Sequence, residues 1–199
     1  NGMLGTDICQ LLESVKRPYI AFDRKWDITD PKIFKSFPQV EWVINCAAYT
    51  AVDDCESHYK EAELINGYAV GNLGQWAAEN NVKVIHFSTD YVFDGTQNRP
   101  YTESDLVNPV NAYGRSKLLG ESLLRESCKQ SYIFRIQWLY GKNGSHFVKT
   151  IKRLAETRTE LSIVDDQIGA PTWTATIANA VLEVIRQTPP YGVYHFSSK

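Results

Sequence analysis

A tyrosine and a lysine stand four residues apart in the stretch 111–121, Asn-Ala-Tyr-Gly-Arg-Ser-Lys-Leu-Leu-Gly-Glu. In a helix, side chains at this spacing share one face. An ammonium beside a phenol favours the phenolate, so this spacing predicts a pKa for Tyr113 below its usual value near ~10. A tyrosine of that kind could pass a proton to a carbonyl oxygen at neutral pH. Tyr113 and Lys117 are therefore the first candidates for chemistry.

Taken alone, the pair has a second interpretation. The chain has eleven tyrosines, so a lysine four positions after one of them is close to an even chance if lysine is an ordinary, common residue. A pair on the surface of a helix would add only about 0.2–0.5 kcal/mol to its stability. The surrounding elements must decide between the two.

A threonine follows another of the predicted strands. Residues 82–88 predict a strand, and Thr89 comes directly after it. In an open α/β sheet, ligands bind beyond the carboxyl ends of the strands. The Thr89 hydroxyl could donate to the same carbonyl oxygen as Tyr113 and polarise it for hydride attack. His86, inside the strand, is interpreted as a packed strand histidine and left out of the site.

Strands and helices alternate along the chain, and this predicts an α/β fold with a doubly wound parallel, Rossmann-like sheet and right-handed crossovers. The expected strands are residues 19–22, 42–46, 82–88, 132–136 and 161–164, and the expected helices begin near residue 4, after Asp30-Pro31, at 61–80, around Tyr113, at 147–158 and at 174–187. Residues 139–141 are expected to form a loop.

The sequence at both ends of the chain predicts that it is a fragment of a longer protein. The chain begins without Met in a Gly-rich turn and stops after an alternating run at 194–197. We expect an NAD(P)-binding Rossmann-like domain at 1–137 that lacks its first strand. Substrate-binding segments interleaved with the sheet would follow at 138–199, as a small and incomplete C-terminal lobe.

The glycine turn at the start opens a helix and predicts a phosphate cradle. Backbone N–H groups and the helix dipole there would hold a pyrophosphate, as in the second half of a Gly-x-x-Gly-x-x-Gly fingerprint. Asp23 stands at the end of the expected strand 19–22, where dinucleotide folds place the acid that binds the ribose 2′-hydroxyl. It could equally be a solvated loop acid. Arg24 could pair with a 2′-phosphate, so NAD and NADP both stay open.

Composition narrows the function classes. The 199 residues are 43% hydrophobic with a net charge of −2 and a pI near 6.1, which favours a globular protein without a basic footprint for nucleic acid. The four cysteines are scattered without a Cys-x-x-Cys pair, so neither a disulfide framework nor a metal site is predicted. No apolar run approaches the ~18 residues of a membrane span. The expected location is cytoplasmic.

Five motifs in order carry a resemblance to a known family. They are Asn45-Cys46-Ala47-Ala48-Tyr49-Thr50-Ala51-Val52-Asp53, Ser88-Thr89-Asp90-Tyr91-Val92-Phe93-Asp94-Gly95, Tyr113-Gly114-Arg115-Ser116-Lys117 with Gly120-Glu121, Trp138-Leu139-Tyr140-Gly141 and Asp166-Gln167-Ile168-Gly169-Ala170-Pro171-Thr172. Over nearly its whole length the chain resembles the dTDP-4-dehydrorhamnose reductases, which belong to the extended short-chain dehydrogenase/reductase group.

The resemblance implies a role for each matching residue. Thr89, Tyr113 and Lys117 would be catalytic, with Tyr113 giving the proton and Lys117 holding the nicotinamide ribose while lowering the tyrosine pKa. Implied cofactor contacts are Gly2, Met3 and Leu4 at the pyrophosphate, Asp27 and Ile28 by the adenine, and Ala47, Ala48 and Tyr49 on the nicotinamide side. Asp23, Phe87, Tyr113 and Lys117 complete the expected cofactor contacts. Implied substrate contacts are Thr50, Val52, Thr89, Asp90 and Trp138, although Trp138 has core packing as its alternative.

The function implied is reduction of the C4 keto group of dTDP-4-dehydro-L-rhamnose to dTDP-L-rhamnose with NADPH or NADH. Two alternatives stay open: a non-catalytic NADP-binding regulatory subunit of related fold, and an epimerase or dehydratase acting on another nucleotide sugar. Some relatives bind a divalent ion through acids at a subunit contact. Asp7 matches one of these acids, but the other position is Ala175, so no metal is predicted. The expected partner is a nucleotide sugar, without nucleic acid or membrane, and a homodimer is left open.

Overall fold

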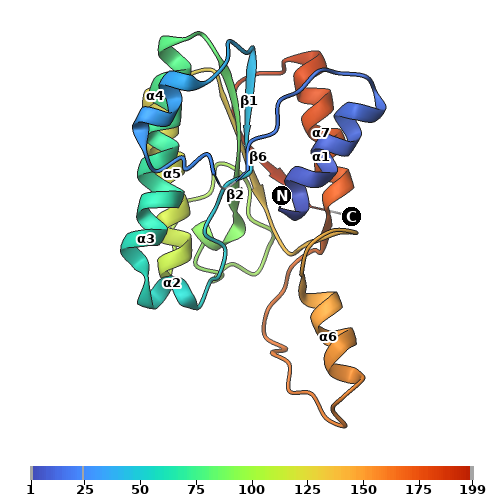
Figure 1. The fold of residues 1–199 in the computed structure, drawn as a ribbon. Coiled ribbons are helices and arrows are strands. Elements are labelled where there is room, and N and C mark those ends of the chain that lie inside the picture. The colour runs from blue at the N-terminus through green and yellow to red at the C-terminus, as the bar shows by residue number, and fades with distance from the viewer. Residues whose placement is uncertain (1, 24, 198–199) are drawn as a thin grey trace. The chain divides into compact units, whose positions relative to one another are not determined.

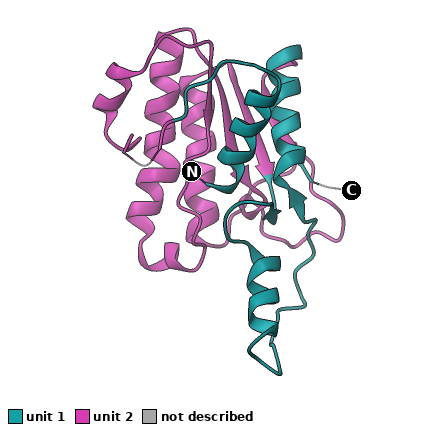
Figure 2. Ribbon diagram, turned by 45° about the vertical axis from the view of Figure 1, so that its right-hand side comes forward, with its two compact units in different colours: residues 1–21, 136–187, 196–199 teal, residues 22–135, 188–195 magenta. Residues whose placement is uncertain are grey.

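The computed structural model describes residues 2–23 and 25–197 of the chain (Figure 1). The chain divides into two compact units, coloured separately in Figure 2. The larger unit comprises residues 22–135 and 188–195, and the smaller comprises 1–21, 136–187 and 196–199. Each unit is described by itself.

The larger unit is built on a four-stranded sheet in the order β1-β2-β3-β6. The strands are β1 (Trp42–Asn45), β2 (Lys83–Thr89), β3 (Ser131–Ile136) and β6 (Gly192–Phe196). β1 and β2 run parallel, in a register that sets Asn45 opposite His86. Almost every residue of β2 and β3 is buried, as expected for strands covered on both faces.

Helices of the larger unit lie together beside this sheet (Figure 1). α3 (Tyr59–Glu63), a π-helical turn (Leu64–Tyr68) and α4 (Ala69–Glu79) follow one another without interruption, and α5 (Ala112–Ser127) packs along all three. Short elements complete the unit: a 3₁₀ turn (Pro31–Ser36), α2 (Asp54–Ser57) and a 3₁₀ turn (Asp90–Val92). The core between α4, α5 and the strands contains Val70, Leu73, Ala77, Val84, Leu124 and Ile133.

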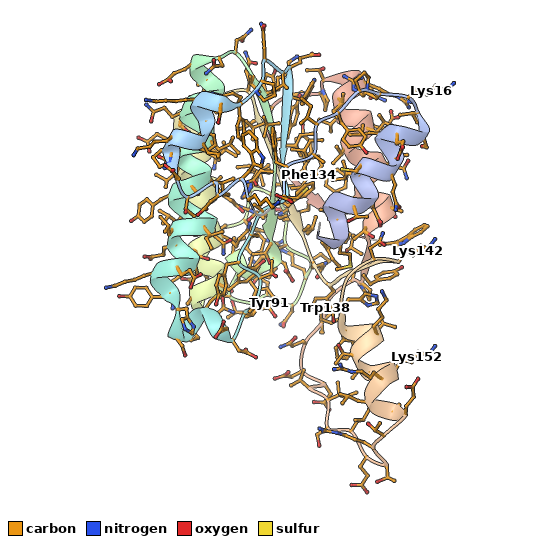
Figure 3. The ribbon with its side chains drawn as sticks, viewed as in Figure 1. Lys16, Tyr91, Phe134, Trp138, Lys142 and Lys152 are labelled. Atoms are coloured by element: carbon orange, nitrogen blue, oxygen red, sulfur yellow. The ribbon has the colours of Figure 1, made fainter. Side chains whose placement is uncertain are left out.

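The smaller unit pairs α1 (Met3–Ser14) with α7 (Thr174–Gln187) and holds the two-stranded parallel sheet of β4 (Leu139–Tyr140) and β5 (Thr172–Trp173). α6 (Phe147–Ala155) has no buried residue and lies apart from α1 and α7 in Figures 1 and 2. The side chain of Lys152 projects outward from α6 in Figure 3. Within this unit α6 is thus an amphipathic helix whose apolar side chains remain accessible.

Two expected strands do not form. Residues 19–22 and 161–164 are irregular, and their apolar side chains are accessible, with Ile20 at 60% and Val164 at 69% exposure. A strand needs a neighbouring ladder for its backbone hydrogen bonds, and no described strand pairs with either segment. Conversely, Leu139–Tyr140, expected as loop, pairs with Thr172–Trp173. The expected domain boundary at 137–138 stays a prediction.

Candidate active site

The N-terminal turns of α5 position the candidate acid. Asn111 adopts an extended conformation and caps the helix, because its Oδ1 accepts from the Gly114 N–H at 2.7 Å. Gly114 is required here, since a Cβ at this position would stand 2.1 Å from the Tyr91 carbonyl oxygen. The close approach of backbone to backbone places Tyr113 on the buried face of α5, directly beside the end of β2.

Tyr113 and Thr89 lie side by side, close enough for the Thr89 side chain to influence the Tyr113 phenol. Thr89 Oγ1 donates to Asp90 Oδ1 at 3.0 Å and accepts from the Tyr91 N–H at 3.2 Å. The structure thus brings Thr89 and Tyr113 together at the end of β2, as the sequence predicts. Two hydroxyls this close can both reach one carbonyl oxygen at hydrogen-bonding distance.

The expected direction of the Tyr113 pKa shift is wrong for this state of the protein. Burial raises the pKa of Tyr113 above its ordinary value, although the hydrogen bond with Thr89 acts in the opposite direction. The physical reason is desolvation, which penalises the charged phenolate, and the nearby Asp90, Cys55 and Tyr91 raise the pKa further. Tyr113 is therefore a neutral hydroxyl throughout the physiological range, and it can act as a donor.

Lys117 is 1% exposed and lies one turn after Tyr113 on the same helix. Its Nζ donates to the Phe87 carbonyl oxygen at 2.6 Å and stands 3.5 Å from His86 Nε2. Burial lowers the pKa of Lys117 to about 8, and Glu121 opposes this shift. The surface-pair interpretation is wrong, because a lysine on a surface would not be buried against a strand.

Asn66 was not predicted, although it organises the same region. It lies in the π-helical turn and is fully buried. Its Oδ1 accepts from the Tyr49 N–H at 2.8 Å, and its Nδ2 donates to the Tyr49 carbonyl at 3.0 Å and to Ser116 Oγ at 3.0 Å. Ser116 Oγ in turn donates to the Tyr113 carbonyl at 2.7 Å. A polar Asn-Gly inside an apolar helical pattern is the signal that could have found it, since π turns often mark functional sites.

The segment after β1 carries the residues expected at the nicotinamide and the sugar. Ala47, Ala48 and Thr50 are exposed, whereas Tyr49 and Val52 pack against the cluster that contains Tyr113. The structure thus brings Tyr49 and Val52 to the side of the candidate acid. The Asn66 clamp on the Tyr49 backbone holds the segment there.

The start of α1 fits a phosphate-binding role. Gly2 is its N-cap residue, without a side-chain cap and with no heavy atom within 4 Å of a Cβ built there. Met3 is half-buried and Leu4 is buried, and no side chain caps the first backbone N–H groups of the helix. An anionic group could accept from them.

The residues expected near the adenosine are exposed or half-buried. Asp23 Oδ1 accepts from the Lys25 N–H at 2.9 Å. The backbone and hydroxyl of Thr29 both donate to Asp27 Oδ1, and these bonds lower the pKa of Asp27. Ile28 is half-buried. Arg24, which left the choice between NAD and NADP open, lies outside the described residues.

Comparison with known proteins identifies the family. The family described as RmlD substrate binding domain matches residues 1–199. The chain belongs to this family. A dTDP-4-dehydrorhamnose reductase from Aggregatibacter actinomycetemcomitans is 39% identical over 210 residues, which cover 100% of this chain and 71% of that protein. The spore coat polysaccharide biosynthesis protein SpsK of Bacillus subtilis is 41% identical over 201 residues, covering 99% and 70%.

Solved structures agree with this assignment. The dTDP-4-dehydrorhamnose reductase of Clostridium acetobutylicum superposes with a TM-score of 0.94 at 42% identity, over 100% of this chain and 72% of its own. The Bacillus anthracis reductase, solved in complex with NADP, gives a TM-score of 0.95 at 36% identity, with the same coverage. The resemblance and the Rossmann-like α/β fold expected from the sequence are confirmed.

Trp138 is one of four described non-glycine residues of this RmlD-family chain with a positive φ. Its φ is +43°, a conformation that costs a bulky residue of order 1–3 kcal/mol and that gathers at functional sites. The indole is 41% exposed and lies against Gly169, where an added Cβ would stand 2.9 Å from the ring. Simple core packing therefore does not describe Trp138. Its contact with substrate stays a prediction.

The position that matches a metal ligand in some RmlD-family relatives is engaged otherwise here. Asp7 accepts from Asn143 Nδ2 at 2.8 Å and from the Thr174 hydroxyl. Ala175, which lines the same hollow as Asp7, has no ligand atom in its side chain. Within residues 2–23 and 25–197, no group of three or more His, Cys, Asp or Glu side chains could hold a metal ion. The expectation of no metal stays a prediction.

Proposed function

We propose that this protein reduces the C4 keto group of dTDP-4-dehydro-L-rhamnose to dTDP-L-rhamnose, with NADPH or NADH as the hydride donor. The observation that carries the proposal is the buried juxtaposition of Tyr113 and Thr89 at the end of β2, with the buried Lys117 one turn along the same helix as Tyr113. Relatives about as similar as the Aggregatibacter protein are named dTDP-4-dehydrorhamnose reductases. The NADP in the Bacillus anthracis complex supports NADPH as the donor, and the open start of α1 at Gly2 fits the cofactor's pyrophosphate.

When bound, the nicotinamide supplies the hydride. The protein supplies hydrogen bonds and a proton to the carbonyl oxygen that the hydride turns into an alcohol. Tyr113, held neutral by burial, donates its hydroxyl proton to that oxygen. Thr89 donates the second hydrogen bond, for which it must release its present bond to Asp90. In its ammonium form, Lys117 adds positive charge one turn away, and this stabilises the phenolate that Tyr113 becomes.

Replacement of Tyr113 tests the proposal. Tyr113→Phe should lower turnover by about 10²–10⁴-fold while NADPH binding stays almost intact, because the change removes a proton donor and little else. Turnover is followed as NADPH oxidation with dTDP-4-keto-6-deoxy-L-mannose, and binding as NADPH fluorescence. Tyr59→Phe, at an exposed tyrosine of α3, is the matched control. Turnover of the Tyr113 variant near that of the wild type would remove Tyr113 from the mechanism.

A change at Lys117 separates its two proposed roles. Lys117→Met should raise the KM for NADPH and also lower kcat, since the residue is assigned both a ribose contact and the charge beside Tyr113. An effect on kcat alone, with an unchanged KM, would contradict the ribose contact. Both constants come from the same titration of NADPH at saturating sugar nucleotide.

Partner and location follow from the proposed substrate. A nucleotide sugar is the expected small-molecule partner. No described helix is long and apolar enough to cross a membrane. The cytoplasmic location stays a proposal, as does a homodimer, which sedimentation of the purified protein would test.

A further inference from the structure

A buried chain of polar side chains runs from β1 through β2 to α5. Asn45 and His86 are direct partners in the parallel ladder of β1 and β2, with exposures of 6% and 0%. Asn45 Nδ2 lies 3.1 Å from His86 Nδ1, and His86 Nε2 lies 3.5 Å from Lys117 Nζ. The chain therefore ends on the lysine of the candidate active site.

The backbone fixes the orientation of the Asn45 amide. The Ala47 N–H donates to Asn45 Oδ1 at 3.0 Å, so the amide NH₂ group must be the end that faces the imidazole. An amide NH₂ is only a donor. His86 Nδ1 must therefore accept, which leaves the single proton of a neutral imidazole on Nε2.

His86 is neutral in this environment. Burial, together with the adjacent Lys117, lowers the pKa of His86 well below its ordinary value. The imidazole thus turns an N–H group, rather than a lone pair, toward the lysine. Tautomers of buried histidines are set in this way by the hydrogen bond at the other ring nitrogen.

The tautomer distinguishes between the two ionisation states of Lys117. An ammonium has three donors and no acceptor, so it cannot form a hydrogen bond with the Nε2–H of His86. A neutral amine has a lone pair that can accept it. The Phe87 carbonyl accepts from Lys117 Nζ in either state. The 3.5 Å separation lies at the outer limit of a hydrogen bond, as expected where a donor faces an ammonium.

We propose that Asn45 and His86 form a positioning pair that presents an imidazole N–H to Lys117 and so favours the neutral amine over the ammonium. The pair would therefore influence how much positive charge Lys117 carries beside Tyr113. The effect of this pair on catalysis rests on the proposed reduction. The tautomer of His86 does not depend on that reaction.

Other ionisable groups near Lys117 come from several elements. Glu121, one turn later on α5, favours the ammonium, but its carboxylate is paired with Arg135 of β3 at 2.7 Å. Asp90 and Cys55 act on Tyr113. His86 is the titratable group in contact with Lys117 Nζ. The tautomer of His86 is therefore the property to test.

Nitrogen NMR measures the tautomer directly on the full chain. The protein has four histidines, so ¹⁵N-histidine labelling gives four imidazole spin systems, and a His86→Gln sample assigns the one of interest. We expect a neutral imidazole with its proton on Nε2 at neutral pH. A proton on Nδ1, or an imidazolium, in the wild-type protein would overturn the proposal without any variant.

Reversing the polarity of the Asn45 contact tests its effect on Lys117. Asn45→Asp keeps the shape but replaces the NH₂ donor by an acceptor, so the His86 proton should move to Nδ1 and Nε2 should turn a lone pair toward Lys117. The titration midpoint of Lys117, followed by ¹³Cε-lysine NMR and identified by its absence in Lys117→Met, should rise by at least about 1 pH unit. Asn98→Asp adds the same charge at an exposed position and serves as the control.

An unchanged Lys117 midpoint in Asn45→Asp, with the control also unchanged, would overturn the pair's proposed effect. A role in packing alone would lower stability without moving the midpoint. The kcat of NADPH oxidation should show its pH limb moved in the same direction as the NMR midpoint. Since the NMR measurements need no substrate, failure of the proposed reduction would appear as absent turnover with an intact tautomer, and the two failures are distinguishable.

Discussion

The buried Lys117 makes the stability of the protein depend on pH. Burial lowers its pKa to about 8 from an ordinary 10.5. Below the lower value the folded and unfolded chains both carry the proton, and the folded chain bears the cost of the buried ammonium. Between the two values the unfolded chain binds more protons, so the contribution of Lys117 to the free energy of unfolding rises with pH.

We therefore expect the free energy of unfolding of Lys117→Met not to show this increase with pH. Relative to the variant, the wild type should gain on the order of 3 kcal/mol in free energy of unfolding across this pH window. Urea unfolding at a series of pH values measures the difference. Lys129→Met, at an exposed position just after α5, should follow the wild type. A difference between wild type and Lys117→Met that stays constant with pH would contradict the lowered pKa.

The sequence predicted the acid and the lysine but not their environment. The spacing of Tyr113 and Lys117, and the place of Thr89 at a strand end, depend on local periodicity. The pKa of Tyr113 depends instead on how far the folded protein buries its hydroxyl away from water. The spacing of residues along the sequence does not indicate that burial. His86 and Asn66 were missed because a buried polar residue is recognised by its partners, and these come from β1, α5 and the segment after β1.

A glycine in α5 determines how closely this helix approaches the π-helical turn. A Cβ at Gly120 would stand 2.0 Å from the Asn66 carbonyl oxygen, and a backbone oxygen inside a helix cannot move aside easily. Gly120→Ala should therefore destabilise the protein by roughly 1–3 kcal/mol, despite the higher helix propensity of alanine. Urea unfolding is the measurement.

Glu126→Ala, at an exposed position of the same helix, should change the free energy of unfolding by no more than about 0.5 kcal/mol. If Gly120→Ala were as stable as this control, α5 and the π-helical turn would not be held at the described distance.

Sequence periodicity identified the helices and strands that pack against neighbouring elements. It failed where the formation of a strand depends on a pairing partner that the local sequence does not reveal. The helix at Thr174–Gln187 and the strands at Trp42–Asn45 and Ser131–Ile136 lie where expected, because each buries an apolar face. Residues 19–22 and 161–164 are as apolar, yet pair with no described strand. The short pairing of Leu139–Tyr140 with Thr172–Trp173 joins segments far apart in sequence, and no local pattern indicates it.

For the molecule as a whole, Trp138 gives a test of the proposed substrate. A deoxysugar presents an apolar face that an indole could cover while excluding water from the carbonyl. Trp138→Ala should then cost on the order of 1–3 kcal/mol in kcat/KM for the deoxysugar. Steady-state kinetics and thermal unfolding on one purified variant give both quantities.

The positive φ of Trp138 offers a matched control. Glycine adopts this conformation without strain, so Trp138→Gly should be more stable than Trp138→Ala by about 1 kcal/mol while losing the same kcat/KM. A variant with lowered stability but ordinary kcat/KM would remove Trp138 from the substrate contacts.

The hydrogen bonds between Asn66 and the Tyr49 backbone affect how the segment after β1 opens to solvent. Tyr49 sits between the exposed Ala48 and Thr50, yet its amide hydrogen is held by a fully buried side chain. Exchange of that hydrogen with deuterated solvent requires the π-helical turn to open, not merely the segment to fluctuate. The Tyr49 amide should thus exchange far more slowly than those of its two neighbours, and Asn66→Ser should erase the contrast.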